Sequence, residues 1–227
     1  MHSSQLSIVV RICAWGTLLT GCLATAPKID PEDREALTPV AVTSLLDNDF
    51  HLRSIGFTVF QNKSAPQNIA DWNPNGLLES ASVGALRTAG MPSARELPLA
   101  DLTVKNIEEV ALTAAQRAGV KTLVTIGYMH AENQPFLNPG SYGIYNRAAN
   151  TCLYSKFFVT VWNVGEKSRR KGSPQVECSR LDGIVWKSTL AEYSTEETAR
   201  IRKALISQLN GQITNALSDT GITSRAP

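Results

Sequence analysis

The C-terminal segment of this 227-residue chain carries the pattern that most restricts its fold. Apolar side chains recur there at helical spacing and stay on one face for about five turns. They are Ile201, Ala204, Leu205, Leu209, Ile213, Ala216 and Leu217. Ser194 and Glu197 stand at the spacing of a capping box, in which each side chain accepts a hydrogen bond from the other residue's amide. A one-sided helix of this length needs a second layer to cover, and we expect that layer to be a sheet.

Further patterns predict the other elements of that fold. Helical spacing of apolar residues predicts helices over 77–89 and 107–118, ended by Gly90 and Gly119. β-branched runs predict strands over 40–45, 54–60, 120–129, 153–164 and 183–190. The first two strands are expected to be neighbours, and the last two to form an antiparallel hairpin across which Trp162 and Trp186 pack. Polar loops are expected at 61–74, 132–150 and 166–182.

The hydrophobic content of 43% is enough for a globular core. We therefore predict an α/β (α+β) fold, with a single mixed sheet of about five strands covered by about three helices, the last of them amphipathic. One globular domain is expected over residues 38–220.

The N-terminal region has a different character. Residues 12–19 form an apolar run of about eight residues, too short to span a bilayer, which needs about 20. This run is typical of a signal-peptide core, so residues 1–21 are expected to be removed. The segment 22–37 is rich in Ala, Thr, Pro and charge, and is expected to be a flexible tether without regular structure.

The run closes with Leu19-Thr20-Gly21-Cys22, which resembles the lipobox of bacterial lipoproteins. The resemblance implies that Cys22 becomes the acylated first residue of the mature protein and that the lipid bilayer is its partner. The residue after Cys22 is Leu23 rather than Asp, which by resemblance to sorted lipoproteins favours the outer membrane over the inner membrane, with the body facing the periplasm. The alternative is an ordinary cysteine near the end of a hydrophobic leader.

The charge of the chain bears on whether it binds nucleic acid, and its cysteines bear on whether it contains a disulfide. The chain has 22 Lys and Arg against 20 Asp and Glu, and the leader removes only Arg11, so the mature chain is nearly neutral and no nucleic-acid partner is expected. Cys152 and Cys178 remain after the leader and the acylated residue are set aside. In an oxidising periplasm they are expected to form a disulfide, worth roughly 3.5 kcal/mol, if the loop between them folds back. Two separate thiols are the alternative, and no Cys-x-x-Cys spacing indicates zinc.

Two segments are candidates for contact with a partner. The basic cluster of the predicted hairpin tip could attract lipid phosphates or an acidic partner, or could be a solvated turn that discourages edge aggregation. It consists of Lys167, Arg169, Arg170 and Lys171. The long loop 132–150 carries Phe136, Tyr142 and Tyr145, which could contact a protein or could pack over the sheet edge.

The sequence gives little support to catalysis. The mature chain has two histidines, His51 in an expected turn and His130 at an expected strand end, and it lacks the nucleophile-elbow, zinc-protease and P-loop motifs. We therefore predict no catalytic residue, no metal site and no cofactor. The rival hypotheses are a periplasmic ligand-binding or lipid-binding module and a hydrolase that uses His51 or His130.

The order of elements from about residue 40 to 217, with the strand Gly183-Ile-Val-Trp-Lys-Ser-Thr189 before the last helix, resembles envelope lipoproteins of the DUF4136 type. It is more loosely similar to the CsgG, TolB N-terminal and LpoB groups. The resemblance implies a binding or assembly role without a catalytic residue. We therefore expect a membrane-anchored periplasmic lipoprotein that acts as a non-catalytic accessory factor and has an envelope protein as partner.

Overall fold

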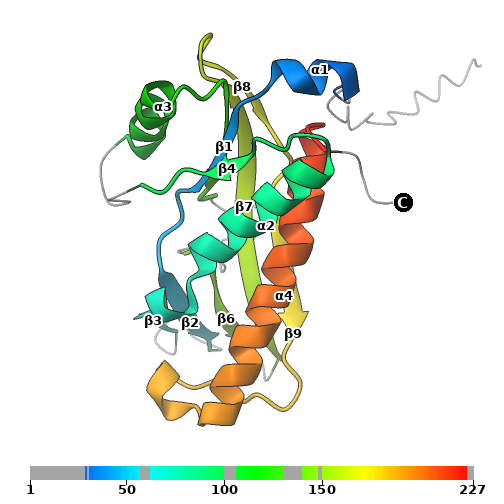
Figure 1. Ribbon diagram of the computed structural model, residues 1–227. Coiled ribbons are helices and arrows are strands. Elements are labelled where there is room, and N and C mark those ends of the chain that lie inside the picture. Colours follow the sequence, from blue (N-terminus) through cyan, green and yellow to red (C-terminus); the bar gives the residue numbers. More distant parts are fainter. Residues whose placement is uncertain are drawn as a thin grey trace, which may run out of the picture.

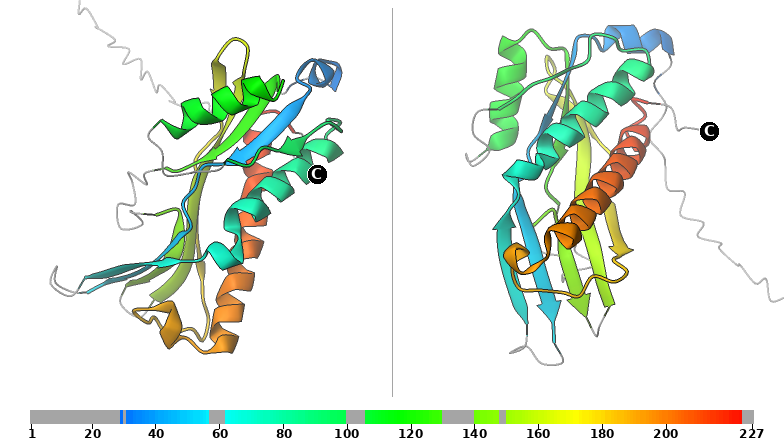
Figure 2. Two further views of the ribbon diagram at one scale, coloured as in Figure 1. Left: turned by 60° about the vertical axis from the view of Figure 1, so that its left-hand side comes forward. Right: turned by 60° about the horizontal axis from the view of Figure 1, so that its bottom comes forward.

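The computed structural model describes residues 29, 31–56, 62–99, 106–129, 140–147 and 150–223. In these ranges the chain forms one mixed sheet with helices on both faces, as Figures 1 and 2 show. The predicted α/β class with a single sheet is confirmed. The predicted size is wrong, because the described residues form nine strands and four α-helices.

The strands are β1 Val40–Ser44, β2 Asp49–Ile55, β3 Lys63–Asn68, β4 Arg95–Glu96, β5 Thr122–Gly127, β6 Tyr142–Arg147, β7 Asn150–Asn163, β8 Ser168–Lys171 and β9 Gln175–Arg180. The α-helices are α1 Pro31–Ala36, α2 Pro74–Thr88, α3 Ile107–Arg117 and α4 Thr195–Asp219. Short 3-10 helices cover Ala70–Trp72 and Leu190–Glu192.

The long strand β7 holds the sheet together. Its first half pairs with β6 along one edge and with β9 along the other. Its second half pairs with β5 along the edge that β6 occupies and with β8 along the edge that β9 occupies. The sheet order is β3-β2-β6-β7-β5-β1-β4, with β8 and β9 on the other edge of β7. The sheet therefore consists of two half-sheets that share one strand.

Helices α2 and α4 cover one face of the sheet and bury the main core (Figure 2). Residues of β7 at odd positions, such as Phe157 and Val159, pack there with Leu205 and Leu209 of α4. The predicted capping box of α4 is confirmed: Glu197 N donates to Ser194 Oγ at 3.1 Å, and Ser194 N donates to the Glu197 carboxylate at 2.7 Å.

Helix α3 lies on the opposite face of the sheet. It contributes the small side chains Ala111 and Ala115 to a second, smaller core cluster with Leu123 and Trp162. Alanine lets a helix approach a sheet closely, so few large side chains join α3 to the body.

Strands β1 and β2 are not neighbours, contrary to the sequence prediction. β1 pairs in parallel with β5, and β2 pairs in parallel with β6. β1 and β2 therefore lie in different half-sheets, one after the other along the direction of the strands. Between them, Leu46 is fully buried in the main core and β2 begins at Asp49, so the chain continues into β2 instead of reversing.

The predicted strand 183–190 is also wrong. The strands that follow β7 in the sequence and pair with it are β8 and β9, which lie inside the expected loop 166–182, and residues 184–187 have no regular structure. Trp186 therefore does not pair across a hairpin, but lies half-buried against the main core. The sequence of β8 is Ser-Arg-Arg-Lys, and pairing to β7 decides its conformation despite its polarity.

Two other expected loops contain strands. The segment 61–74 holds the edge strand β3, in which Pro66 lacks a donor for a further neighbour. The segment 132–150 holds β6, whose Tyr142 and Ile144 face the main core. Of the predicted strand 54–60, residues 57–60 lie outside the described ranges.

Part of the expected flexible tether is folded. Residues 31–36 form α1, and Ile29 N donates a hydrogen bond of 3.2 Å to Gly221 O just after α4. Arg34 Nη1 donates to Ala89 O at the end of α2, at 2.9 Å. Pro31 opens α1 instead of interrupting a helix, which is the position where proline is tolerated. Across the described ranges, no helix has the length and apolar character needed to cross a membrane.

Candidate functional site

A cavity that is open to solvent, with a volume of about 570 Å³, lies between α3 and the face of the sheet opposite α2 and α4. Volumes of this size are typical of ligand sites. The described residues that line it are Leu45, Asn106, Ile107, Glu108, Glu109, Leu112, Gly127, Tyr128, Phe158 and Trp162. We call this space the α3 cavity.

Strand β7 supplies the aromatic part of the cavity wall. Phe158 and Trp162 stand four residues apart and so lie on the same face of the sheet. Gly127 is the partner of Phe158 in β5, and a Cβ atom at Gly127 would lie 3.1 Å from Phe158 Cζ. Glycine at this position leaves room for the ring. Trp162 Nε1 donates to Thr125 Oγ1 at 3.0 Å, which fixes the indole.

Basic side chains lie over the rings that line the α3 cavity. Lys171 Nζ is 3.6 Å from the ring centroid of Phe158, and the Arg169 guanidinium carbon is 5.3 Å from that of Trp162. Arg169 Nη1 is also 3.6 Å from a carboxylate oxygen of Glu108 on α3. The aromatic wall is therefore flanked by charges of both signs, which suits a ligand or protein segment with apolar and polar parts.

Helix α3 forms the outer wall of the cavity and is held lightly. Its buried residues are Ala111 and Ala115, and Val110 is 41% exposed. Its ion pair with Arg169 joins two substantially exposed side chains, and such pairs contribute about 0–1 kcal/mol. The wall that a ligand would contact first is thus less firmly packed than the rest of the fold.

A buried polar cluster lies on the same face of the sheet, where the half-sheets meet. His51 of β2 is 7% exposed, and its Nδ1 has no hydrogen-bond partner among the described residues. Burial lowers the pKa of His51, against the opposite influence of Asp47. The expected surface turn at His51 is wrong: Phe50 and Leu52 face the main core, so His51 points to the other face. A side chain at Gly140, where φ is +91°, would overlap the imidazole.

Lys156 of β7 belongs to the same polar cluster. It is fully buried, its Nζ donates to Met129 O at 2.6 Å, and it lies 4.3 Å from the Tyr128 ring centroid. Burial lowers the pKa of Lys156 to about 8, and the nearby Asp47 carboxylate opposes that shift. Burial also raises the pKa of Asp47. Within the described ranges, no group of three or more His, Cys, Asp or Glu side chains is placed to hold a metal ion.

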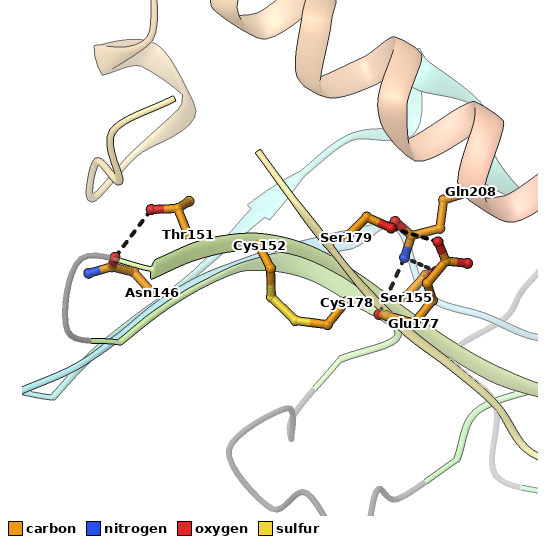
Figure 3. Close-up of a disulfide and its surroundings, with 8 residues drawn as sticks. All are labelled: Asn146, Thr151, Cys152, Ser155, Glu177, Cys178, Ser179 and Gln208. Atoms are coloured by element: carbon orange, nitrogen blue, oxygen red, sulfur yellow. Dashed lines mark hydrogen bonds between the residues drawn. A yellow bond between two sulfur atoms is a disulfide. The ribbon is translucent and has the colours of Figure 1, made fainter. Parts of the chain in front are cut away.

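Cys152 and Cys178 form a disulfide that joins β7 to β9, as Figure 3 shows. Their Cα atoms are 5.5 Å apart. The chain folds back between them because β9 returns along the first half of β7, where Cys178 is the partner of Tyr154. Both cysteines lie at even-numbered positions of paired strands, on the face of the sheet away from α4.

The aromatic candidates for partner contact are not exposed where they are described. Tyr142 is fully buried and its hydroxyl donates to Asp47 O. Tyr145 is 8% exposed and packs with Tyr154. Both residues lie on β6 and are buried in the sheet, so they are not available for contact with a partner. Phe136, His130 and Cys22 lie outside the described residues.

The basic cluster occupies the β7–β8 turn and β8. Lys167, Arg169 and Lys171 are exposed, whereas Arg170 is half-buried and its Nη1 donates to Thr220 O at 3.2 Å. The cluster was predicted in the loop of a hairpin between 153–164 and 183–190; in the structure only Lys167 lies in a turn, and the other three residues belong to β8 of the β7–β8 hairpin.

No family model and no curated protein sequence matches the chain. Among solved structures, the fold is similar to the PelC dodecamer from Paraburkholderia phytofirmans, with 12% identity over 89% of this chain and 94% of that chain and a TM-score of 0.39. It is also similar to a Xanthomonas campestris protein of family model DUF330, with 10% identity over 80% of this chain and 84% of that chain and a TM-score of 0.39. We base no functional conclusion on similarities at this level.

The sequence did not reveal the α3 cavity, because its walls come from four separate segments. One signal was available: Phe158 and Trp162 alternate with the core residues of β7 and so must face away from α4. The sequence did not reveal the polar cluster either. A single lysine within an apolar strand is usually solvent-exposed, so nothing in the pattern indicated that Lys156 is buried.

Proposed function

We propose that the chain is a lipid-anchored protein of the cell envelope that acts by binding, as an accessory or assembly factor on the periplasmic side of the outer membrane. The α3 cavity is its binding site, and a segment of an envelope protein is the ligand. The observation that carries this proposal is the wall of Tyr128, Phe158 and Trp162 beneath a lightly packed helix.

The chemistry of the cavity supports a protein ligand. Aromatic residues and arginine are enriched in the cores of protein interfaces, and the α3 cavity has three aromatic rings, with Arg169 beside that of Trp162. Glu108 and Glu109 add acceptors for backbone or side-chain donors of a bound segment. A ligand that packs against Leu112 would also add apolar contacts to α3.

A photo-crosslinking amino acid at Glu109, which lines the cavity, tests this proposal in cells. A matched control carries the same amino acid at Lys203, an exposed position of α4 on the other face of the sheet. We expect one envelope protein to be crosslinked from position 109 and not from position 203. Equal recovery from both positions, or no specific product from position 109, would contradict the proposal.

A second candidate function, binding of a small molecule, is favoured by the volume of the cavity. At about 570 Å³ it is within the range of pockets for small ligands. Native mass spectrometry of the purified protein would show a retained compound, and Leu112→Glu should release it. A protein that carries no compound and still gives the crosslink from position 109 would exclude this alternative.

The lipid anchor is proposed from the lipobox-like sequence that ends at Cys22. Its test is metabolic labelling with palmitate, which Cys22→Ala should abolish. Labelling that persists in the variant would contradict the proposed anchor. We propose no catalytic role for His51, because its ring is buried and Gly140 lies against it.

A further inference from the structure

Two segments that are far apart in the sequence meet at the C-terminal end of α4. Ile29, the first described residue, donates its amide hydrogen to Gly221 O at 3.2 Å. Arg170 of β8 donates to Thr220 O, also at 3.2 Å. The point where the N-terminal segment joins the body and the basic hairpin thus lie at the same end of the molecule, the end with α1 and β8 in Figure 1.

The position of Ile29 limits how far this end can be from a membrane. Ile29 is the seventh residue after Cys22, and an extended chain spans at most about 3.6 Å per residue. With Cys22 acylated as proposed above, Ile29 stays within roughly 25 Å of the bilayer surface in any conformation of the tether. Helix α4 has 25 residues and runs about 37 Å away from this end. The tether therefore limits the distance of the α1 end from the membrane more tightly than that of the start of α4.

The β7–β8 hairpin carries positive charge at this end. Lys167, Arg169 and Lys171 are exposed, and we call them the basic tip. Two acidic side chains lie near it: Glu166, which accepts a hydrogen bond from Ser168, and Glu108, which pairs with Arg169. The turn from Glu166 to Lys171 holds four basic residues and one acidic residue, so its net charge is positive.

We propose that the basic tip binds anionic lipid headgroups of the membrane in which Cys22 is anchored. This inference rests on the proposed lipid anchor, but not on the proposed ligand of the α3 cavity. Electrostatic attraction is effective only within about 8 Å of a surface at physiological salt, and the short tether allows that approach. The contact would hold the body upright, with the β2–β3 hairpin directed away from the membrane.

Sedimentation with vesicles tests the surface without the anchor. The protein is the mature chain with Cys22→Ser, exported by a cleavable signal in place of residues 1–21. We expect binding to vesicles of phosphatidylcholine that contain phosphatidylglycerol, and none to phosphatidylcholine alone. Each basic residue near an anionic surface contributes about fivefold in affinity. Lys167→Gln with Arg169→Gln should therefore weaken binding by roughly 25-fold, and added salt should weaken it further.

Arg202→Gln with Lys203→Gln is the matched control, because it removes the same charges from exposed positions nearer the start of α4. We expect these changes to leave vesicle binding unaltered. Equal losses in the two pairs, or equal binding to both kinds of vesicle, would overturn the proposal. Thermal unfolding of each variant confirms that it is folded. The vesicle assay uses the chain without its anchor, so a failure of vesicle binding is distinguishable from a failure of palmitate labelling or of the crosslink from position 109.

Discussion

The two faces of the sheet are covered in different ways. Helices α2 and α4 bury one face with large aliphatic side chains, such as Leu205 and Ile213. The other face has α3 over the second half of β7, attached through alanines, and the disulfide on the first half. Aromatic rings, basic side chains and a cavity lie on this second face. The comparison indicates that one face supplies most of the stability, which leaves the other available for recognition.

The largest effect is expected from the face under α4. Leu209 is 1% exposed, and Leu209→Ala should lower the free energy of unfolding by about 2–5 kcal/mol through lost burial and a new cavity. Val110→Ala on the exposed side of α3 should change it by no more than about 0.5 kcal/mol. Urea unfolding of both variants measures the contrast, and similar losses would show that the faces contribute equally.

Removal of the disulfide should have the next largest effect. Cys152→Ala with Cys178→Ala frees a loop closed over a sequence separation of 26 residues. The expected loss is about 2–4 kcal/mol, because the unfolded chain gains conformational freedom. Reducing agent should destabilise the unaltered protein to the same extent and have no effect on the double variant. A protein that is insensitive to reduction would contradict a structural role for the bond.

A smaller effect is expected from the contact between α3 and the sheet. Ala111 is fully buried, so Ala111→Leu should displace α3 and destabilise the protein by about 1–3 kcal/mol. The exposed Ala118 provides a control, Ala118→Leu, that should be nearly neutral. The same displacement should reduce the crosslink from position 109. An undiminished crosslink in Ala111→Leu would place the binding site elsewhere.

The last expected effect comes from Lys156, and it is a dependence of stability on pH. The pKa of this lysine is lowered from 10.5 to about 8 in the folded protein. Between these values the unfolded chain binds more protons than the folded one, so this group makes stability rise with pH from about 8 to 10.5. Lys156→Met should lose that rise, whereas Lys203→Met should keep it. Parallel pH profiles for the two variants would contradict burial of a charged Lys156.

The sequence predicted the elements whose own pattern is strong. α2, α3 and α4 have helical spacing of apolar residues and clear ends, and β5 and β7 have apolar runs. It did not predict β3, β6, β8 and β9, which are polar or contain glycine and become strands because a neighbour pairs with them. Gly183–Leu190 shows the opposite case, a β-like sequence that finds no strand partner. The cavity depends on these long-range pairings, so local pattern could not reveal it.

The sharing of β7 by both half-sheets has a consequence for how the molecule unfolds. Neither half-sheet can open without breaking hydrogen bonds to β7. Helix α4 also packs along both half-sheets, on the face that carries the main core. The two halves therefore behave as one cooperative unit, with the slowest amide exchange along β7. Opening of α3 alone breaks none of these pairings, so that helix can fluctuate while the sheet stays intact.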